Sequence, residues 1–273
     1  MMDAINREAY GAAADKLAEF SASAGVQQIS SVAEEILAAA DLLRREPRLR
    51  RALADPARAA ADRSGLVSSI LSGKVSDETV ALLSALVSGR WSGPGALLDG
   101  VERLGVDALL SAADKAGELA DVEDELFRFG QVASGDPRLA AALADSTAPL
   151  ASRQELVRDL LDGKVKPATL SLALLALAGF GGRGVDSSLS RLVELAAAKR
   201  DRSVAHVTTA IPLTAEEEDR LAGRLAALYG RGVSLKIDID PRVIGGMRVK
   251  VGSDLYDGTV ARRLAEARTA LAK

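Results

Sequence analysis

Three glycines in the second half of the chain have the spacing of a dinucleotide-binding loop. Gly179, Gly181 and Gly184 match the pattern G-x-G-x-x-G, in which backbone amides surround a pyrophosphate. That pattern needs a strand before its first glycine and a helix that begins at its last one. Residues 169–178 instead align with residues 79–88, which have the composition of a helix. The sequence therefore favours a loop between two helices over a cofactor site.

Two Gly-Lys-Val triplets, at Gly73 and Gly163, suggest part of a phosphate-binding loop. That loop needs a glycine five residues before its Gly-Lys pair, and Ser or Thr directly after the lysine. The chain has Ser68 and Arg158 at the first of these positions, and a valine follows each lysine. We interpret both triplets as helix ends, because glycine tolerates the left-handed conformation found there.

Side chains for metal binding or nucleophilic catalysis are scarce. His206 is the only histidine, and the chain has no cysteine and no G-x-S-x-G elbow for a Ser-His-acid triad. Basic and acidic residues are interspersed, with a formal net charge of -3, so nucleic acid is not an expected partner. These observations predict a protein without a catalytic centre, cofactor or metal ion.

The elements that would position any site are mainly helical. Hydrophobic residues make up 48% of the 273 residues but aromatic residues only 3%, which is typical of closely packed helices. The longest apolar stretch, residues 170–180, is shorter than the roughly 20 residues that a membrane helix needs. The N-terminal residues lack the apolar core of a signal peptide. We expect a soluble chain that could lie beside a membrane.

An internal repeat organises the helical part. The segment that begins PRLRRALADP at Pro47 returns as PRLAAALADS at Pro137, an offset of about 90 residues. In each copy a short apolar turn is followed by a helix that ends at a glycine. Residues 77–88 and 167–178 are apolar nearly all round, so we expect these two helices to be the most deeply buried.

The sequence changes character near Ser203. SVAHVTTAI predicts a strand, and Thr214 with Glu217 forms a capping box at the start of a helix. Residues 233–239 and 247–251 alternate apolar and polar side chains, as half-buried strands do. A last amphipathic helix is predicted by the apolar positions Val260, Leu264, Ala267 and Leu271.

The predicted fold class is α+β, mainly α, with tandem helical-bundle units followed by a small β-α-β-β-α domain. We place the first helical unit at residues 1–105, the repeated unit at 106–202 and the C-terminal domain at 203–273. In that domain, the acids from Glu216 to Asp219 lie in a first helical turn, where the helix dipole favours them. The arginines of the last helix are interpreted as a solvated face, with an acidic partner as the alternative.

The segment VIGGMRVKVGSDLYDGTVARRLAEA, residues 243–267, resembles the signature of the delta subunit of rotary F-type ATP synthases, the oligomycin-sensitivity-conferral protein family. In that family a glycine-rich turn opens a strand, an Asp-Gly-Ser turn follows, and an Arg-rich helix closes the chain. The matching residues are Ile244, Gly245, Gly246, Asp257, Gly258, Thr259, Arg262, Arg263 and Leu264. Thr259 replaces a serine and keeps the hydroxyl that can cap a helix.

The helical part resembles the family more loosely. Arg7, Tyr10 and Ala13 fit its first helix, and Leu53 to Pro56 fit a Leu-x-x-Pro hinge. The family ordinarily has one helical bundle, whereas this chain repeats most of it. Which copy makes the family's usual contact is therefore left open.

The resemblance implies a non-catalytic stator subunit, peripheral at the cytoplasmic face of the cell membrane and in contact with the membrane only through the ATP synthase complex. In the family, the N-terminal bundle holds N-terminal segments of the alpha subunits, and the C-terminal part holds the b subunit of the peripheral stalk. The residues expected to bind the alpha segment are Tyr10, Ala14, Leu17, Thr79, Leu82, Leu83 and Leu86. The C-terminal signature is expected on the b side. Burial in the chain's own core is the alternative for each side chain.

Two other classes of protein stay open on the residues alone. A generic helical-repeat adaptor would share the helical array, but it gives no reason for the Ile-Gly-Gly and Asp-Gly-Thr motifs. A nucleotide-dependent enzyme would need a cofactor at the glycine loop after residue 178, and such a cofactor would raise the melting temperature on binding.

Overall fold

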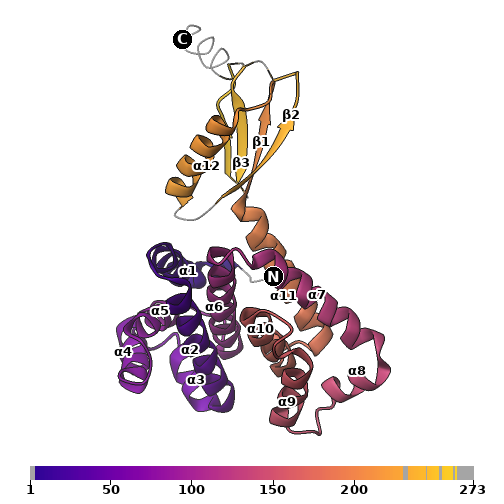
Figure 1. The fold of residues 1–273 in the computed structure, drawn as a ribbon. Helices are drawn as coiled ribbons and strands as arrows, with labels where there is room; N and C mark the ends of the chain where they lie inside the picture. Colours follow the sequence, from indigo (N-terminus) through magenta and orange to yellow (C-terminus); the bar gives the residue numbers. More distant parts are fainter. Residues whose placement is uncertain (1–3, 230–232, 244, 252–253, 261, 263–273) are drawn as a thin grey trace. The chain divides into compact units, whose positions relative to one another are not determined.

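The computed structural model describes residues 4–229, 233–243, 245–251, 254–260 and 262. Contacts within the chain divide it into two compact units, Met1–Ala196 and Ala197–Lys273. Each unit has its own hydrophobic core. The first is helical and the second contains a sheet (Figure 1). The prediction of a mainly helical α+β protein is confirmed.

The helices of the first unit form two copies of a five-helix pattern. The first copy comprises α1 (Ala4–Ser23), α2 (Val26–Arg45), α3 (Pro47–Ala54), α4 (Ala60–Leu71) and α5 (Asp77–Ser88). The second comprises α6 (Pro94–Lys115), α7 (Leu119–Gly135), α8 (Pro137–Ala144), α9 (Leu150–Leu161) and α10 (Pro167–Ala178). A 3-10 turn, η1 (Phe180–Gly182), then leads to α11 (Val185–Ser203). The repeat therefore extends to α1 and its counterpart α6.

The central helix of this unit is α6, and not α5 or α10 as the sequence suggested. α6 lies between the first copy and α10 (Figure 1), and it packs against helices of both copies. Its buried residues extend from Leu97 to Ala113, whereas α5 and α10 each bury fewer. The reason is that α6 both closes the first copy and opens the second.

Both copies use a carboxylate of their second helix to hold the start of their fifth helix. Glu35 on α2 accepts hydrogen bonds from the backbone amide of Ser76 (3.0 Å) and the hydroxyl of Thr79 (2.5 Å). Glu125 on α7 accepts from an amide and a threonine hydroxyl at the start of α10, at 2.9 and 2.6 Å. The two copies thus share a tertiary contact as well as a helix pattern.

The Gly-Lys-Val triplets end α4 and α9, as predicted. Gly73 and Gly163 have φ angles of 73° and 68°, a left-handed conformation that glycine adopts without a Cβ clash. The amides of Lys74 and Lys164 donate back to the carbonyl of the last helical residue. The triplets are helix-terminating turns.

The division into units 1–105, 106–202 and 203–273 stays a prediction. In the structure α6 continues through residue 105 without a break, and one hydrophobic core includes side chains from α1 to α11.

Over its described residues, the second unit is a mixed sheet accompanied by the helix α12 (Ala215–Tyr229). Its strands β1 (Val204–Thr209), β2 (Ser234–Ile239), β3 (Met247–Val251) and β4 (Asp254–Asp257) lie in the order β2-β1-β3-β4. β1 is parallel to β2 and antiparallel to β3, and β3 is antiparallel to β4. The core consists of Ala205, Val207, Leu225, Val233, Val249 and Val251.

Among the described residues, the strands and helix of this unit agree with the sequence prediction, except that β4 was missed. The predicted capping box is present, because the amide of Glu217 donates to the hydroxyl of Thr214 (3.3 Å) and the amide of Thr214 donates to the Glu217 carboxylate (2.9 Å). β4 was not predicted, since its side chains are exposed or half-buried and show no alternation. The predicted last helix falls mostly on residues 263–271, outside the described residues.

Candidate functional site

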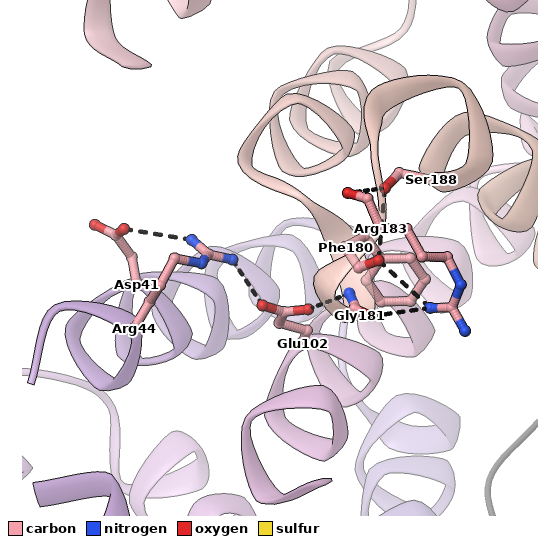
Figure 2. A network of polar contacts seen from close by, with 7 residues as sticks. All are labelled: Asp41, Arg44, Glu102, Phe180, Gly181, Arg183 and Ser188. Carbon is pink, nitrogen blue, oxygen red and sulfur yellow. Dashed lines mark hydrogen bonds and ion pairs between the residues drawn. The ribbon is translucent and has the colours of Figure 1, made fainter. Parts of the chain in front are cut away.

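The G-x-G-x-x-G loop connects α10 to α11 and binds a carboxylate of the protein itself. A helix precedes it, and Gly179 ends that helix with a φ of 92°. The amide of Gly181 donates a hydrogen bond of 2.8 Å to the carboxylate of Glu102 on α6 (Figure 2). The reading as a loop at a helix end is confirmed, because the strand that a dinucleotide-binding loop requires is replaced by α10.

Glu102 connects three elements. Its side chain is buried, at 1% exposure, and its second oxygen accepts a 2.6 Å ion pair from Arg44 on α2. Asp41, one turn earlier on α2, lies 3.5 Å from the same guanidinium (Figure 2). Burial raises the pKa of Glu102, although the Gly181 amide and Arg44 oppose the rise. Sequence reasoning missed this residue; in the largely apolar stretch LLDGVERLGV it is one of two acids, the other being Asp99.

The rest of the loop packs on itself around Phe180, which is 5% exposed. The guanidinium of Arg183 and the hydroxyl of Ser188 both donate to the Phe180 carbonyl, at 3.4 and 3.5 Å (Figure 2). The loop thus connects the second copy to α11 through a turn held by its own hydrogen bonds.

Most residues predicted to bind an alpha segment lie inside the first unit. The buried members, at 0 to 3% exposure, are Leu17, Thr79, Leu82, Leu83 and Leu86. Their side chains belong to the layer that holds α1 and α5 in place. They are buried in this structure, and their contact with an alpha segment stays a prediction.

Tyr10 and Ala14, on α1, are half-buried. The hydroxyl of Tyr10 donates to Asp107 on α6 (2.7 Å), and Arg103 donates to the same carboxylate (2.8 Å). Burial, and next the charge of Asp107, raises the pKa of the Tyr10 phenol well above its usual value. Tyr10 therefore faces α6, so the structure does not bring it together with the α5 residues on one open face. Asp107 carried no sequence signal, because nothing in the periodicity links it to α1.

α1 and α5 nevertheless pack directly against each other. A Cβ on Gly89, just after α5, would lie 2.6 Å from the carbonyl oxygen of Ala9. The side-chain amide of Asn6 donates to the hydroxyl of Ser92 (2.9 Å), and the Ser92 amide donates back to Asn6 (3.0 Å). Near this end of α1 Ile5 is 57% exposed. α1 and α5 thus approach each other to backbone contact at Gly89, and α1 carries an exposed large apolar side chain, Ile5.

The two parts of the C-terminal signature meet in the second unit. Gly245 and Gly246 have φ angles of 62° and 77°, and a Cβ on Gly246 would lie 2.4 Å from the carbonyl oxygen of Gly258. The Gly258 amide donates to the Met247 carbonyl (3.0 Å), and the Val260 amide donates to the Gly245 carbonyl (3.2 Å). The glycines therefore form a clasp between two turns that are separated by β3 and β4.

The contacts of the clasp continue to Thr259 and Arg262. Asp257 accepts hydrogen bonds from the amide (3.0 Å) and hydroxyl (2.7 Å) of Thr259. The Thr259 hydroxyl accepts from the amide of Arg262 at 3.4 Å, which is the capping role expected from the sequence. Arg262 is exposed. Ile244, Arg263 and Leu264 lie outside the described residues.

Metal-ligand clusters and membrane-spanning helices are both missing from the part of the chain that the structure describes. There, His, Asp and Glu side chains nowhere gather in threes in a way that could hold a metal ion. None of the helices described is both long and apolar enough to cross a membrane. His206 lies exposed on β1.

Comparison with known proteins gives matches over the whole chain. The family model for the ATP synthase delta (OSCP) subunit matches residues 106–271. The ATP synthase subunit delta of Salinispora arenicola (strain CNS-205) is 58% identical over 273 residues, which is 100% of both chains. That of Streptomyces griseus subsp. griseus is 43% identical over 266 residues, covering 97% of this chain and 98% of the relative. The chain therefore belongs to the ATP synthase delta (OSCP) subunit family, as a non-catalytic stator subunit that links F1 to the peripheral stalk.

Proposed function

We propose that the paired helices α1 and α5 bind an N-terminal segment of an alpha subunit, and that the second unit binds the b subunit of the peripheral stalk. Family membership supports the choice of partners. The observation that carries the first contact is the direct packing of α1 on α5 at Gly89, with the apolar side chain of Ile5 exposed on α1. An amphipathic helix can lay its apolar face on such a helix pair.

The predicted residues take different roles in this proposal. Leu17, Leu82 and their buried neighbours fix the spacing of α1 and α5, and Tyr10 fixes α1 on α6. Ala14 is kept as a direct contact, since it is half-buried on α1. On the b side, the glycine clasp holds Thr259 and Arg262 in place, and Arg262, Arg263 and Leu264 make the contact.

Binding of two synthetic peptides to the full chain tests the proposal. One peptide carries the alpha N-terminal segment and the other the C-terminal segment of b; we expect Kd values near the micromolar range, about -8 kcal/mol. Ile5→Glu should weaken the alpha peptide roughly tenfold without affecting the b peptide. Val132→Glu, at an exposed apolar residue of α7 (61% exposed), serves as the control. Arg262→Glu should weaken only the b peptide.

Hydrogen exchange on the same complexes locates the contacts. The alpha peptide should protect α1 and α5, and the b peptide should protect the second unit. Protection of α6 and α10 by the alpha peptide would move that contact to the second copy, which the family model covers from residue 106 onward. If neither peptide bound at ten times the expected Kd, the assignment of both surfaces would be wrong.

A further inference from the structure

A groove of about 440 Å³ lies between α7 and α11 in the second copy. Its floor includes Leu126 and Leu189, which are buried, and its apolar walls include Val193 and Phe127. The Phe127 side chain is 52% exposed. The charged residues that line the groove, Asp186 and Glu194, are both acids. An exposed aromatic ring over an apolar floor with a polar rim is the composition of a protein-binding surface.

The corresponding helices of the first copy, α2 and α6, are closed directly on each other. Gly105 of α6 lies against Leu37 of α2, where a Cβ on the glycine would be 2.5 Å from Leu37 Cδ2. The ion pair between Arg44 and Glu102 joins the same two helices at 2.6 Å. A residue without a side chain and a partly buried ion pair thus keep α2 and α6 in direct contact.

On α7, the second copy lacks the groups that close the first. Aligned by the repeat, Phe127 takes the place of Leu37, and Ser134 takes the place of Arg44. The aromatic ring of Phe127 is larger than the leucine side chain that it replaces. Ser134 cannot form the ion pair that the Arg44 guanidinium forms in the first copy.

The same is true on α11. α6 begins at Pro94 and α11 at Val185, so the two helices align at an offset of 91 residues, at which Leu104 and Leu195 are both buried. This alignment puts Ala196 at the position of Gly105, and Val193 at that of Glu102. Because both helices carry larger side chains at the crossing and lack the ion pair, they cannot approach as α2 and α6 do. The groove is the result.

We propose that this groove binds an amphipathic helix of another ATP synthase subunit, with basic residues beside its apolar stripe. The apolar stripe would cover Phe127 and Val193. Asp186 and Glu194 are eight residues apart on α11, about two helical turns, so basic residues at a similar spacing would face both acids. Glu194 now pairs with Arg191 at 2.5 Å, and the partner's basic residue would compete for that carboxylate.

Photo-cross-linking in the purified ATP synthase tests which chain occupies the groove. The chain has no cysteine, so Gln131→Cys on the groove rim can carry a single benzophenone probe, with Val132→Cys as the control on the same helix. We expect a cross-link from Gln131→Cys alone, to a segment of another subunit with the stated pattern. A cross-link to a second copy, to this chain's own residues or to an acidic segment would overturn the proposal, as would none.

A peptide with the sequence of the cross-linked segment then tests the chemistry. Phe127→Glu should weaken its binding to the full chain at least about tenfold, as loss of a central aromatic contact does. Val132→Glu should change it less than about twofold, and circular dichroism should show both variants folded. Asp186→Asn with Glu194→Gln should weaken binding and reduce its salt dependence, whereas Asp159→Asn on α9 should not. Equal effects of the groove and control variants would refute the proposal.

Discussion

At the residue scale, Glu102 shows what the glycine-rich loop after α10 binds: a carboxylate of the protein itself. A glycine-rich turn offers a backbone amide to an anion, and in this protein the amide of Gly181 is used by a carboxylate of α6. The glycines have the spacing of a dinucleotide-binding loop, but the anion that this loop binds is the side chain of Glu102. The same carboxylate also binds Arg44, so one side chain joins both copies of the repeat.

Removal of the Glu102 carboxylate should destabilise the first unit. In Glu102→Leu, Arg44 and the Gly181 amide lose their acceptor at a site where Glu102 is 1% exposed, and we expect a loss of about 3 kcal/mol in the free energy of unfolding. Glu102→Gln keeps an acceptor for the amide and should lose about half as much. Urea denaturation followed by circular dichroism measures both. A Glu102→Leu variant as stable as the wild type would contradict this account.

Glu35 should make the first unit sensitive to acid. Its partial burial alone would raise the pKa, but the hydrogen bonds from Ser76 and Thr79 outweigh burial and lower the pKa below its ordinary value of 4.5. A carboxyl with a lowered pKa in the folded state stabilises the fold above the ordinary pKa, and this contribution is lost as the pH falls through the lowered value.

The Glu35→Gln variant tests this sign. At pH 7 it should be less stable than the wild type by about 2 kcal/mol, and the difference should shrink as the pH falls below 4.5. Glu34→Gln, at the exposed neighbouring position, is the control and should change stability little at either pH. A constant difference across the pH range would show that Glu35 is not responsible.

At the element scale, the two copies differ in how their second helix meets the helix that follows the repeat. Gly105 lets α2 lie directly on α6, whereas the counterpart position in α11 holds Ala196, and Val193, at the position of Glu102, lines a groove. Larger side chains at the crossing and the missing ion pair thus distinguish the open helix pair from the closed one, because helices in contact leave room for few additional atoms.

Gly105→Val should push α2 and α6 apart in the first copy. The new Cβ would lie 2.5 Å from Leu37 Cδ2, and we expect a loss of about 1 to 3 kcal/mol from overpacking. Leu37→Ala in the same chain should recover part of the loss. Gly130→Ala on α7, where a Cβ meets no atom within 4 Å, should be neutral or stabilise by up to about 1 kcal/mol. Thermal unfolding distinguishes the three; equal effects of Gly105→Val and Gly130→Ala would exclude the steric explanation.

At the scale of the whole molecule, the chain has two compact units with separate cores. The second unit depends on the clasp, because Gly246 combines a φ of 77° with a backbone contact that leaves no room for a Cβ. Separate cores allow separate unfolding transitions, so a single melting temperature need not describe this protein.

Gly246→Ala should therefore lower the stability of the second unit alone. We expect a loss of at least about 1 to 3 kcal/mol there, visible as faster hydrogen exchange in β1 and β3 while α2 and α6 keep their protection. Gly223→Ala in α12, where a Cβ meets no atom, should instead stabilise the second unit by about 1 kcal/mol. Loss of protection in α6 would show that the units unfold together.

Much of the secondary structure and the family could be read from the sequence alone. Glycines at helix ends, the Thr214 capping box, the strand alternation and the C-terminal signature are signals carried by residues close together along the chain. Each has a local physical cause, such as a left-handed backbone angle or an orphan amide, so each is visible without the fold. The repeat is also visible in the sequence, because the segments that begin at Pro47 and Pro137 share residues at matching positions.

Tertiary structure alone decided where the long-range contacts lie. Gly181 is bound by a carboxylate 79 residues away in the chain, Tyr10 faces Asp107 rather than α5, and Gly246 lies against Gly258. The same repeat gives a closed pair at Gly105 and a groove at Val193. Periodicity shows which face of a helix is apolar, but it does not show which neighbour that face meets. That choice depends on how closely two backbones can approach, and a few side-chain atoms at the crossing decide it.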